Sequence, residues 1–232
     1  MLMCKLDKKI AIVTGGAQGI GKGSAKILAK EGATVIIADF LDIAEETAEE
    51  LRKMGYNVEA KIIDVRDLNA ANVLVEEIMS KYGKIDILFN NAGVNKRARF
   101  ENVDIKTRDH IFNVNILGVW NMTRAVYSYM LKAKYGKIIN TASVTGVKVV
   151  DEGQTTYAIT KAAIVGFTKA LAYEAAEHGI TVNAILPGWV QTPMVEKSAQ
   201  NSRPEDPESA LRDMAKFIPI KRLCYTEEIG DL

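Results

Sequence analysis

Three polar side chains in the second half of the sequence have the types and spacing needed to move a proton to or from an oxygen atom. Tyr157 and Lys161 stand four residues apart in the run YAITK, and Ser143 precedes the tyrosine by 14 residues. Residues four apart on a helix share one face, so we expect the phenol and the ammonium to be neighbours. A free tyrosine has a pKa near ~10, and a cation about 4 Å away in an effective dielectric of about 20 lowers it by about 3. We therefore expect Tyr157 to act as general acid or base, Lys161 to make it acidic, and Ser143 to donate to the reacting oxygen.

A glycine-rich turn near the start of the sequence, TGGAQGIG, has the composition of a phosphate-binding loop. It follows an apolar run and opens a stretch with helical spacing, which is the context that a dinucleotide fingerprint requires. Glycine lets the backbone turn sharply and approach a pyrophosphate, whose charge the N–H groups of a helix N-terminus can hold. An ordinary glycine turn is the alternative. The residues that we expect to touch a dinucleotide here are Gly15, Gln18, Gly19, Ile20 and Gly21.

Asp39 ends the next apolar run, TVIIAD, about 20 residues after the glycine turn, where a carboxylate can accept hydrogen bonds from the adenosine ribose. The same carboxylate repels a ribose 2′-phosphate. Phe40 and Leu41 follow it in place of a basic residue, and Gln18 is neutral. These features favour NAD over NADP as the cofactor. A capping or loop role for Asp39 is the alternative, and Lys22 is expected on the outer face of its helix.

Short β-rich runs alternate with longer helical runs over most of the chain. Strands rich in Val, Ile and Leu, each followed by a helix, predict a parallel sheet covered on both faces. The fold class is therefore α/β, a doubly wound parallel sheet in a single domain spanning 1–232. The expected strands are 10–14, 34–39, 58–64, 85–90, 137–142 and 181–186, and the expected helices are 20–31, 43–54, 68–82, 104–132 and 157–176.

One stretch near the end reads as a loop. Residues 187–207 are rich in Pro, Gln, Asn, Ser and charge, and a loop of this length in a compact domain is usually a lid. We expect a substrate lid over about 188–217. Residues 226–232 look like a helix that has only begun, with Thr226 as its cap.

Composition excludes several classes of protein. The sequence has 30 basic and 29 acidic residues, a net charge of +1, so neither nucleic acid nor an anionic membrane is an expected partner. Two cysteines cannot form a disulfide framework, and His110 and His178 have no ligand-spaced neighbours, so no metal site is expected. No signal peptide or membrane span is visible, and we expect a cytoplasmic protein.

These residues together resemble the short-chain dehydrogenase/reductase family, over nearly the whole chain. Besides the glycine turn and the Ser143, Tyr157 and Lys161 set, the match covers Asp64-Val65, the run Asn90-Asn91-Ala92-Gly93, Asn115, Pro187-Gly188, Val190 and Thr192.

The resemblance implies roles for these further residues. Asp64 and Val65 would contact adenine, and Asn115 would hold the lysine through water in a proton relay. It also implies cofactor contacts at Asn91, Gly93, Tyr157, Lys161, Pro187, Gly188, Val190 and Thr192. A satisfied helix asparagine is the alternative for Asn115.

The resemblance implies a Rossmann fold with strand order 3-2-1-4-5-6 and commonly a seventh strand. This chain lacks the seventh: either the sequence is cut short or the strand is absent, which would leave the sixth strand as an exposed edge. Family members usually form tetramers, and we expect a homo-oligomer, a dimer or a tetramer.

Within the family the sequence is most similar to bacterial sugar- and polyol-type oxidoreductases. The expected reaction is hydride transfer between a nicotinamide cofactor, NAD favoured, and a secondary alcohol or ketone of a small polyol, sugar or hydroxy acid. Ser143, Gln154, Tyr157 and Trp189 are the expected substrate contacts, although Trp189 could equally pack the lid. The alternatives are a 3-oxoacyl-[acyl-carrier-protein] reductase using NADPH and a non-catalytic dinucleotide-binding subunit.

Overall fold

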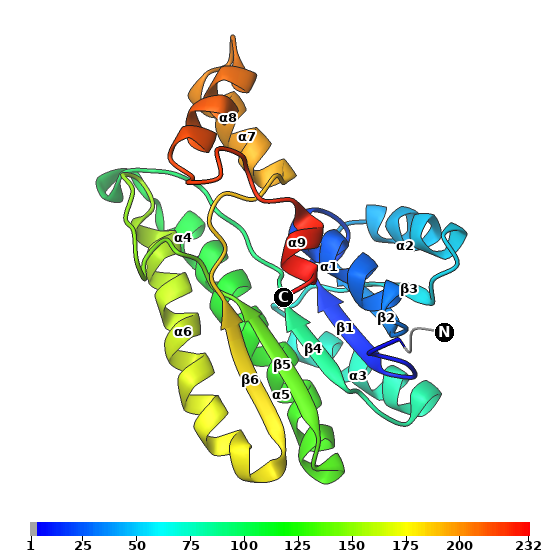
Figure 1. Cartoon of the computed structure of the whole chain (residues 1–232). Coiled ribbons are helices and arrows are strands. Elements are labelled where there is room, and N and C mark those ends of the chain that lie inside the picture. The colour runs from blue at the N-terminus through cyan, green and yellow to red at the C-terminus, as the bar shows by residue number, and fades with distance from the viewer. Residues whose placement is uncertain (1–3) are drawn as a thin grey trace.

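The structure is a computed structural model that describes residues 4–232 (Figure 1). Its centre is one six-stranded sheet in the order β3-β2-β1-β4-β5-β6, and every neighbouring pair is parallel. This confirms the predicted doubly wound α/β fold and its strand order. The strands are β1 (Ile10–Thr14), β2 (Thr34–Asp39), β3 (Val58–Ile62), β4 (Ile87–Asn90), β5 (Gly136–Thr141) and β6 (Ile180–Ile185).

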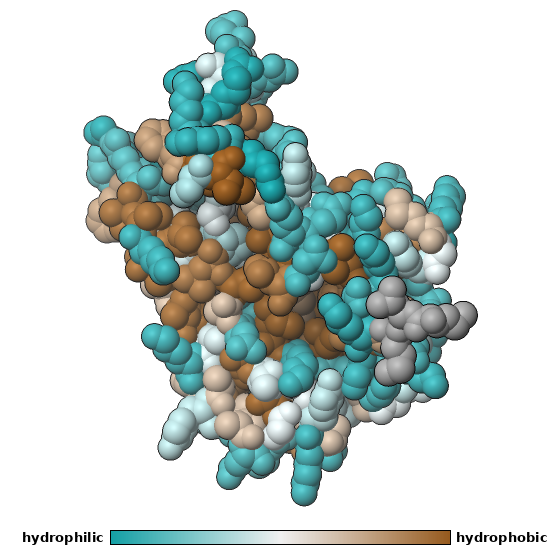
Figure 2. All heavy atoms as spheres, in the orientation of Figure 1, coloured by the Kyte–Doolittle hydropathy of each residue, from teal (hydrophilic) through white to brown (hydrophobic). Residues whose placement is uncertain are grey.

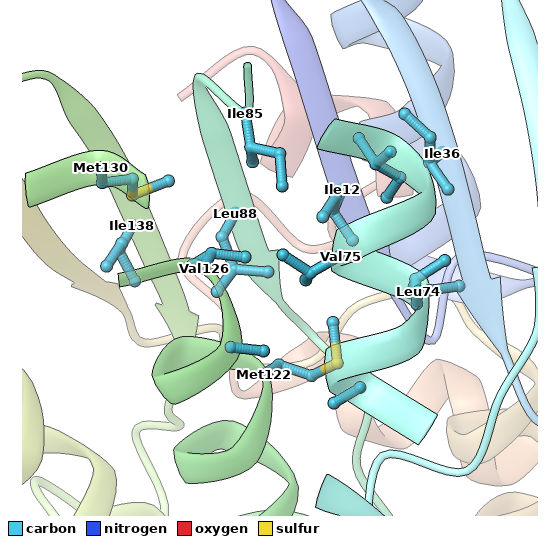
Figure 3. Packing of buried hydrophobic residues seen from close by; sticks show 14 of the residues in the cluster. Ile12, Ile36, Leu74, Val75, Ile85, Leu88, Met122, Val126, Met130 and Ile138 are labelled. Carbon is cyan, nitrogen blue, oxygen red and sulfur yellow. The ribbon is translucent and has the colours of Figure 1, made fainter. Parts of the chain in front are cut away.

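The central strands are apolar on both faces because both faces are covered. In β1, Ile10 and Ile12 point into one hydrophobic cluster, whereas Ala11 and Val13 point into the other. Figure 3 shows the first cluster, in which Leu74 and Val75 of one helix and Met122 and Val126 of another pack over the sheet. Burial on both sides explains why these runs do not alternate with polar residues.

The helices cover the sheet in two layers. On one face lie α3 (Leu68–Tyr82), α5 (Gly118–Ala133) and α6 (Thr155–Ala175), and on the other lie α1 (Gly19–Lys30) and α2 (Ile43–Lys53). A short helix, α9 (Thr226–Gly230), packs against α1. The remaining elements are η1 (Phe100–Asn102), α4 (Ile105–Phe112), η2 (Asn113–Leu117), η3 (Ala176–His178), α7 (Pro193–Ser202) and α8 (Pro207–Lys216).

The expected single helix over 104–132 is wrong in its middle. Between α4 and α5 the chain makes a π-helical turn, η2, which contains the buried Asn115. Such a turn inserts an extra residue and changes the direction of the side chains that follow. Hydrophobic spacing does not reveal it, because apolar residues continue through it.

The expectation of a loop over 187–207 is wrong for residues 193–202, which form α7, and α8 begins where that stretch ends. Thr192 accepts a hydrogen bond from the backbone of Val195 at 3.3 Å and begins α7, and Asp206 begins α8 in the same way with Ser209 at 3.0 Å. Each cap is followed by proline at the first helical position, a strong start signal. In Figure 1 α7 and α8 stand out from the sheet as a separate projection. The polar composition of this stretch reflects the exposed surfaces of α7 and α8.

The short final helix begins one residue earlier than expected. Tyr225, and not Thr226, is its cap residue, and the Glu228 carboxylate accepts from the Tyr225 backbone N–H at 2.7 Å. Thr226 contacts α1 instead, since a side chain on Gly23 would lie 2.5 Å from its Cβ. The helix is thereby fixed on α1, beside the glycine turn.

Candidate active site

A cavity of about 420 Å³ opens at the carboxyl edge of the sheet, where doubly wound folds bind their ligands. It runs along the ends of several neighbouring strands and reaches helix α6. Many of the residues predicted from the sequence line it: Gly15, Gln18, Gly19, Ile20, Asp39, Asp64, Val65, Asn91, Gly93, Tyr157, Lys161 and Thr192.

The glycine turn has the backbone shape that its sequence predicts. Gly15 and Gly19 have φ of 62° and 56°, the left-handed region that favours glycine. A Cβ on Gly21 would lie 2.0 Å from the Gly15 carbonyl oxygen, so the helix can approach the turn only without a side chain there. The cap residue Gln18 makes no side-chain cap bond, and the first turn of α1 contains no acidic residue. The helix therefore points unneutralised N–H groups at the cavity, an environment suited to an anion.

Asp39 is held against the glycine turn at the end of β2. One carboxylate oxygen accepts from the Ala17 backbone N–H at 2.9 Å, and the other accepts from the Leu41 N–H at 3.0 Å. Lys22, the nearest lysine in sequence to the turn, is paired with Glu50 at 2.6 Å. The carboxylate is thus fixed on the cavity wall beside Gln18, and Lys22 is engaged elsewhere.

Asn91 joins the glycine turn to the end of β4. Its amide nitrogen donates to the carbonyls of Thr14 and Gly15 at 3.2 and 3.0 Å, while the Thr14 hydroxyl accepts from the Asn91 and Ala92 backbone N–H groups. The neighbouring Asn90 bridges instead to Asn140 on β5 at 2.9 Å. These bonds fix the two strand ends that form the floor of the cavity.

Tyr157 and Lys161 lie together on α6, as their spacing predicts. The Lys161 Nζ is 5.5 Å from the Tyr157 ring centroid and donates to the Thr141 carbonyl at 2.7 Å. Lys161 is 4% exposed, and burial lowers its pKa to about 8. Ser143, buried two residues after the end of β5, lies close enough to the phenol to influence its pKa and accepts from the Thr145 N–H at 3.1 Å.

The electrostatics of the tyrosine differ from the expectation. Desolvation raises the pKa of Tyr157 above its usual value, and the hydrogen bond from Ser143 opposes that rise. The ammonium sits under the ring and bonds to a carbonyl, which reduces its effect on the phenol oxygen. The protein alone therefore does not make this phenol acidic.

Asn115 holds the chain that follows β4. Its oxygen accepts from the Val94 N–H at 2.8 Å, and its nitrogen donates to the Val94 carbonyl at 2.9 Å and to the Thr160 hydroxyl at 3.1 Å. A Cβ on Gly93 would lie 3.5 Å from both the Asn115 Oδ1 and the Lys161 Nζ. Glycine at this position therefore leaves the space between asparagine and lysine free.

Several predicted site residues do not lie on the wall of this cavity. Gly21 and Asn115 act behind it, through the contacts given above, and Ser143 reaches it through Tyr157. The others are Gln154, Pro187, Gly188, Trp189 and Val190. Of these, Pro187 accepts from the Val144 N–H at 3.2 Å, and Trp189 accepts from the Cys224 N–H at 3.0 Å.

The structure adds wall residues that the sequence analysis did not assign to the site. Arg66 lies over one end of the cavity, with its guanidinium held by Asp64 at 2.5–2.9 Å and 3.4 Å from His110 Nδ1. Arg66 holds the pKa of the Asp64 carboxyl below its usual range. In the sequence, the signal that could have predicted this wall residue is the arginine two positions after Asp64. The other added wall residues are Ala38, Phe40, Leu41, Ile63, Ala92, Val94, Val114, Thr141, Pro193 and Met194.

Residues 4–232 contain no group of three or more His, Cys, Asp or Glu side chains arranged to hold a metal ion. Within the same range, no helix is long and apolar enough to cross a membrane.

Comparison with known proteins identifies the class. The family model described as short chain dehydrogenase matches residues 9–203. Oxidoreductase UcpA of Salmonella typhimurium is 48% identical over 230 residues, which cover 99% of this chain and 88% of the relative. The 3-oxoacyl-[acyl-carrier-protein] reductase FabG of Thermotoga maritima is 38% identical over 232 residues, which cover 98% of this chain and 89% of the relative.

Solved structures agree. Levodione reductase superposes with a TM-score of 0.93 at 31% identity, covering 98% of this chain and 89% of that one. A variant of actinorhodin polyketide ketoreductase with NADPH superposes with a TM-score of 0.91 at 33% sequence identity, and the match covers 99% of this chain and 90% of that one. NAD⁺-bound xylitol dehydrogenase superposes with a TM-score of 0.89 at 30% sequence identity, and the match covers 98% of this chain and 91% of that one. The chain belongs to the short-chain dehydrogenase family and is an oxidoreductase that acts on CH–OH groups.

Proposed function

We propose that this enzyme interconverts a secondary alcohol and a ketone on a small polyol, sugar or hydroxy acid, with NAD as the cofactor. The observation that carries the proposal is the contact of Ser143, Tyr157 and Lys161 at one end of a cavity whose other end has Asp39 beside a glycine turn. No single part of this arrangement is specific, but together the parts suit proton transfer beside a bound dinucleotide.

The residues present fit a nicotinamide dinucleotide. The uncapped N-terminus of α1 suits its pyrophosphate, and Asp39 suits the ribose hydroxyls at the adenosine end. Gly15, Gly19, Ile20, Asp64, Val65, Asn91, Gly93 and Thr192 would complete the binding surface, and Pro187, Gly188 and Val190 are assigned to it by family resemblance alone. When bound, the nicotinamide supplies or accepts the hydride.

The chain's own residues handle the proton. Tyr157 gives its hydroxyl proton to the substrate oxygen during reduction and takes it back during oxidation. Ser143 donates to the same oxygen, because the Thr145 N–H already occupies one of its acceptor positions. Lys161 places positive charge under the phenol, and a positively charged oxidised nicotinamide would add the stabilisation that the protein alone does not supply. Asn115 keeps the lysine's surroundings in place.

Charge around Asp39 supports NAD over NADP. The carboxylate is fixed by two backbone N–H groups and would face a ribose 2′-phosphate with like charge. Lys22 is paired with Glu50, and Arg66 is paired with Asp64. Each of these cations therefore has a carboxylate partner already.

Substrate selection is assigned to the segment around α7 and α8. We propose residues 188–217 as a lid on a single domain spanning 1–232, with Trp189 and Gln154 as substrate contacts. The bridge between Val190, near the start of this segment, and Cys224, seven residues beyond its end, encloses the segment in one loop, which supports its movement as a unit. The similar xylitol dehydrogenase is named for a polyol, which supports this substrate class.

A 3-oxoacyl-[acyl-carrier-protein] reductase is the second candidate. The 38% identity to FabG over nearly the whole chain favours it, and the proton-transfer residues would serve that reaction equally. It predicts a preference for NADPH, which the environment of Asp39 disfavours.

The deciding experiment is a panel of polyols, sugars, hydroxy acids and 3-oxoacyl thioesters, assayed with each dinucleotide. Our proposal expects turnover of at least one small polyhydroxy substrate, with NAD more efficient than NADP. Turnover confined to 3-oxoacyl thioesters with NADPH would establish the second candidate. Dinucleotide binding without turnover of any compound would indicate a non-catalytic subunit.

We also propose a cytoplasmic homo-oligomer, a dimer or a tetramer. Trp120 on α5 is 54% exposed, and its ring lies tilted against Phe167 of α6 with the centroids 6.0 Å apart, so that two neighbouring helices share an apolar outer surface. Figure 2 shows a second gathering of hydrophobic atoms at the middle of the face seen in Figure 1. Light scattering on the purified chain tests this, and a monomer at micromolar concentration would contradict it.

A further inference from the structure

An arginine and an aspartate form an ion pair on the cavity wall, just beyond the end of β3. The Asp64 carboxylate accepts from the Arg66 Nε at 2.9 Å on both of its oxygens, from Arg66 Nη2 at 2.5 Å, and from the Arg66 backbone N–H at 3.0 Å. Both residues line the same cavity as Asp39 and the glycine turn. An ionised carboxylate has about four acceptor positions, so these four contacts leave none for a ligand.

The family resemblance assigns the contact with adenine to Asp64, and the ion pair changes what this carboxylate can recognise. Adenine differs from the purine hypoxanthine in one substituent: adenine has an amino group that donates, where hypoxanthine has an oxygen that accepts. A free carboxylate would accept from the amino group and repel the oxygen. Because Arg66 fills the acceptor positions of Asp64, the carboxylate cannot distinguish the two bases in this way.

The guanidinium of Arg66 is held in a fixed plane. Its Nε and Nη2 donate to Asp64, and its Nη1 donates to His110 Nδ1 at 3.4 Å, so these bonds lie around the edge of the group. The backbone is fixed as well, because the buried Asn121 of α5 donates to the carbonyls of Val65 and Arg66, both at 3.0 Å. The Arg66 side chain is 40% exposed, and the face of its plane remains for a flat ligand. Guanidinium planes stack on the faces of aromatic rings and of bases, a contact that does not depend on the groups at the edge of the base.

Apolar side chains complete the wall near this arginine. Phe40 and Leu41 follow Asp39, Ile63 precedes Asp64, and all of them line the cavity. Apolar side chains and an exposed guanidinium face both suit the flat surface of a base. The end of the cavity at which Asp39 would hold the ribose therefore also has the groups that a purine requires.

We propose that Arg66, and not Asp64, contacts the purine of the cofactor, by stacking its guanidinium on the face of the base, and that this site does not recognise the amino group of adenine. Asp64 is then a positioning residue, which orients the guanidinium through its hydrogen bonds. The inference rests on the proposed dinucleotide binding and concerns the base-binding end of that same cavity.

The test compares NADH with reduced nicotinamide hypoxanthine dinucleotide, by fluorescence titration of the purified protein. The unaltered protein should bind both with Kd values within about threefold of each other. Arg66→Leu should weaken binding of the hypoxanthine analogue by at least about tenfold. It should also create a preference for NADH of at least about fivefold, because it frees the carboxylate to accept from the amino group. Arg52→Leu removes an ion-paired arginine on α2 that is also 40% exposed but lies outside the cavity, and it should change neither Kd by more than about twofold.

Two further variants separate stacking from charge and from a direct role of the aspartate. Arg66→Lys keeps the positive charge but has no plane to stack, so it should weaken both dinucleotides by at least about fivefold. Asp64→Asn loosens the guanidinium and should weaken both by a similar factor. Melting temperatures of all variants, measured without ligand, show whether each is folded.

The outcomes distinguish this inference from the proposed function. A loss confined to NADH in Asp64→Asn, or a preference of the unaltered protein for NADH beyond the threefold range, would show that the carboxylate recognises the amino group. Either result would overturn the inference and leave the dehydrogenase activity intact, as would unchanged binding in Arg66→Leu. If NADPH binds more tightly than NADH, the same comparison is made with the hypoxanthine analogue of NADPH. Binding of neither NADH nor NADPH would overturn both proposals.

Discussion

Lys161 lies beneath the Tyr157 ring, with its Nζ 5.5 Å from the ring centroid and bonded to the Thr141 carbonyl. Burial opposes the charged form of both groups, since the pKa of the phenol is raised and that of the ammonium is lowered to about 8. Reduction uses the protonated phenol, whereas oxidation needs the phenolate, whose charge a positively charged oxidised nicotinamide would help to stabilise. We infer that binding of the oxidised cofactor completes the electrostatics of the site.

Burial of Lys161 predicts a pH dependence of stability. The unfolded chain keeps this proton up to about pH 10.5, whereas the native protein releases it near pH 8. The unfolded state thus binds more protons between these values, and stability rises with pH across that window. Compared with Lys161→Met, the unaltered protein should gain up to about 3 kcal/mol in free energy of unfolding from pH 8 to 10.5. Urea denaturation over this range checks it, and a constant difference would contradict the assignment.

Close packing at the glycine turn predicts the outcome of a matched pair of alanine substitutions. Gly21→Ala would place a Cβ 2.0 Å from the Gly15 carbonyl oxygen, so the turn must move, and dinucleotide affinity should fall by at least about tenfold. Gly166→Ala lies on an exposed part of α6 with no atom within 4 Å of the new Cβ. It should bind normally and be about 0.5–1 kcal/mol more stable. Titration of NADH fluorescence and thermal melting measure both, and equal affinities would refute this role of the turn.

The position of Asp39 predicts a change in coenzyme preference. Asp39→Asn keeps an oxygen able to accept from Ala17 or Leu41 but removes the negative charge that would face a 2′-phosphate. The ratio of kcat/KM for NAD to that for NADP should therefore fall by about tenfold or more. Steady-state kinetics with both coenzymes provide the measurement. If the unaltered enzyme already prefers NADP, Asp39 does not have the role proposed for it.

Local sequence signals predicted the sheet and the contact between Tyr157 and Lys161, because each depends on few neighbours. The alternation of apolar runs with helices predicted the parallel sheet, the family resemblance implied its strand order, and helical spacing predicted the Tyr157–Lys161 contact. The π-helical turn around Asn115 could not be predicted in this way, since apolar residues continue through it. The helix α7 was mistaken for a loop because its exposed face has loop-like composition, and α8, which begins where that stretch ends, was not predicted.

Features that depend on tertiary contacts were also missed. Arg66 enters the cavity wall only because Asp64 holds its guanidinium there, and the pairing of Asn95 with Gln154 joins loops 59 residues apart. The raised pKa of Tyr157 reflects desolvation, which spacing along a helix does not report. Sequence predicted which groups would meet, and the structure adds the surroundings that set their charge.

The most direct test of the account is Tyr157→Phe, which removes one hydroxyl and keeps the ring over Lys161. NADH affinity, measured by fluorescence titration, should stay within about threefold of the unaltered value, while kcat for the best substrate of the panel should fall by at least about a hundredfold. Retained turnover with normal binding would show that the proton moves by another route and would contradict the central claim.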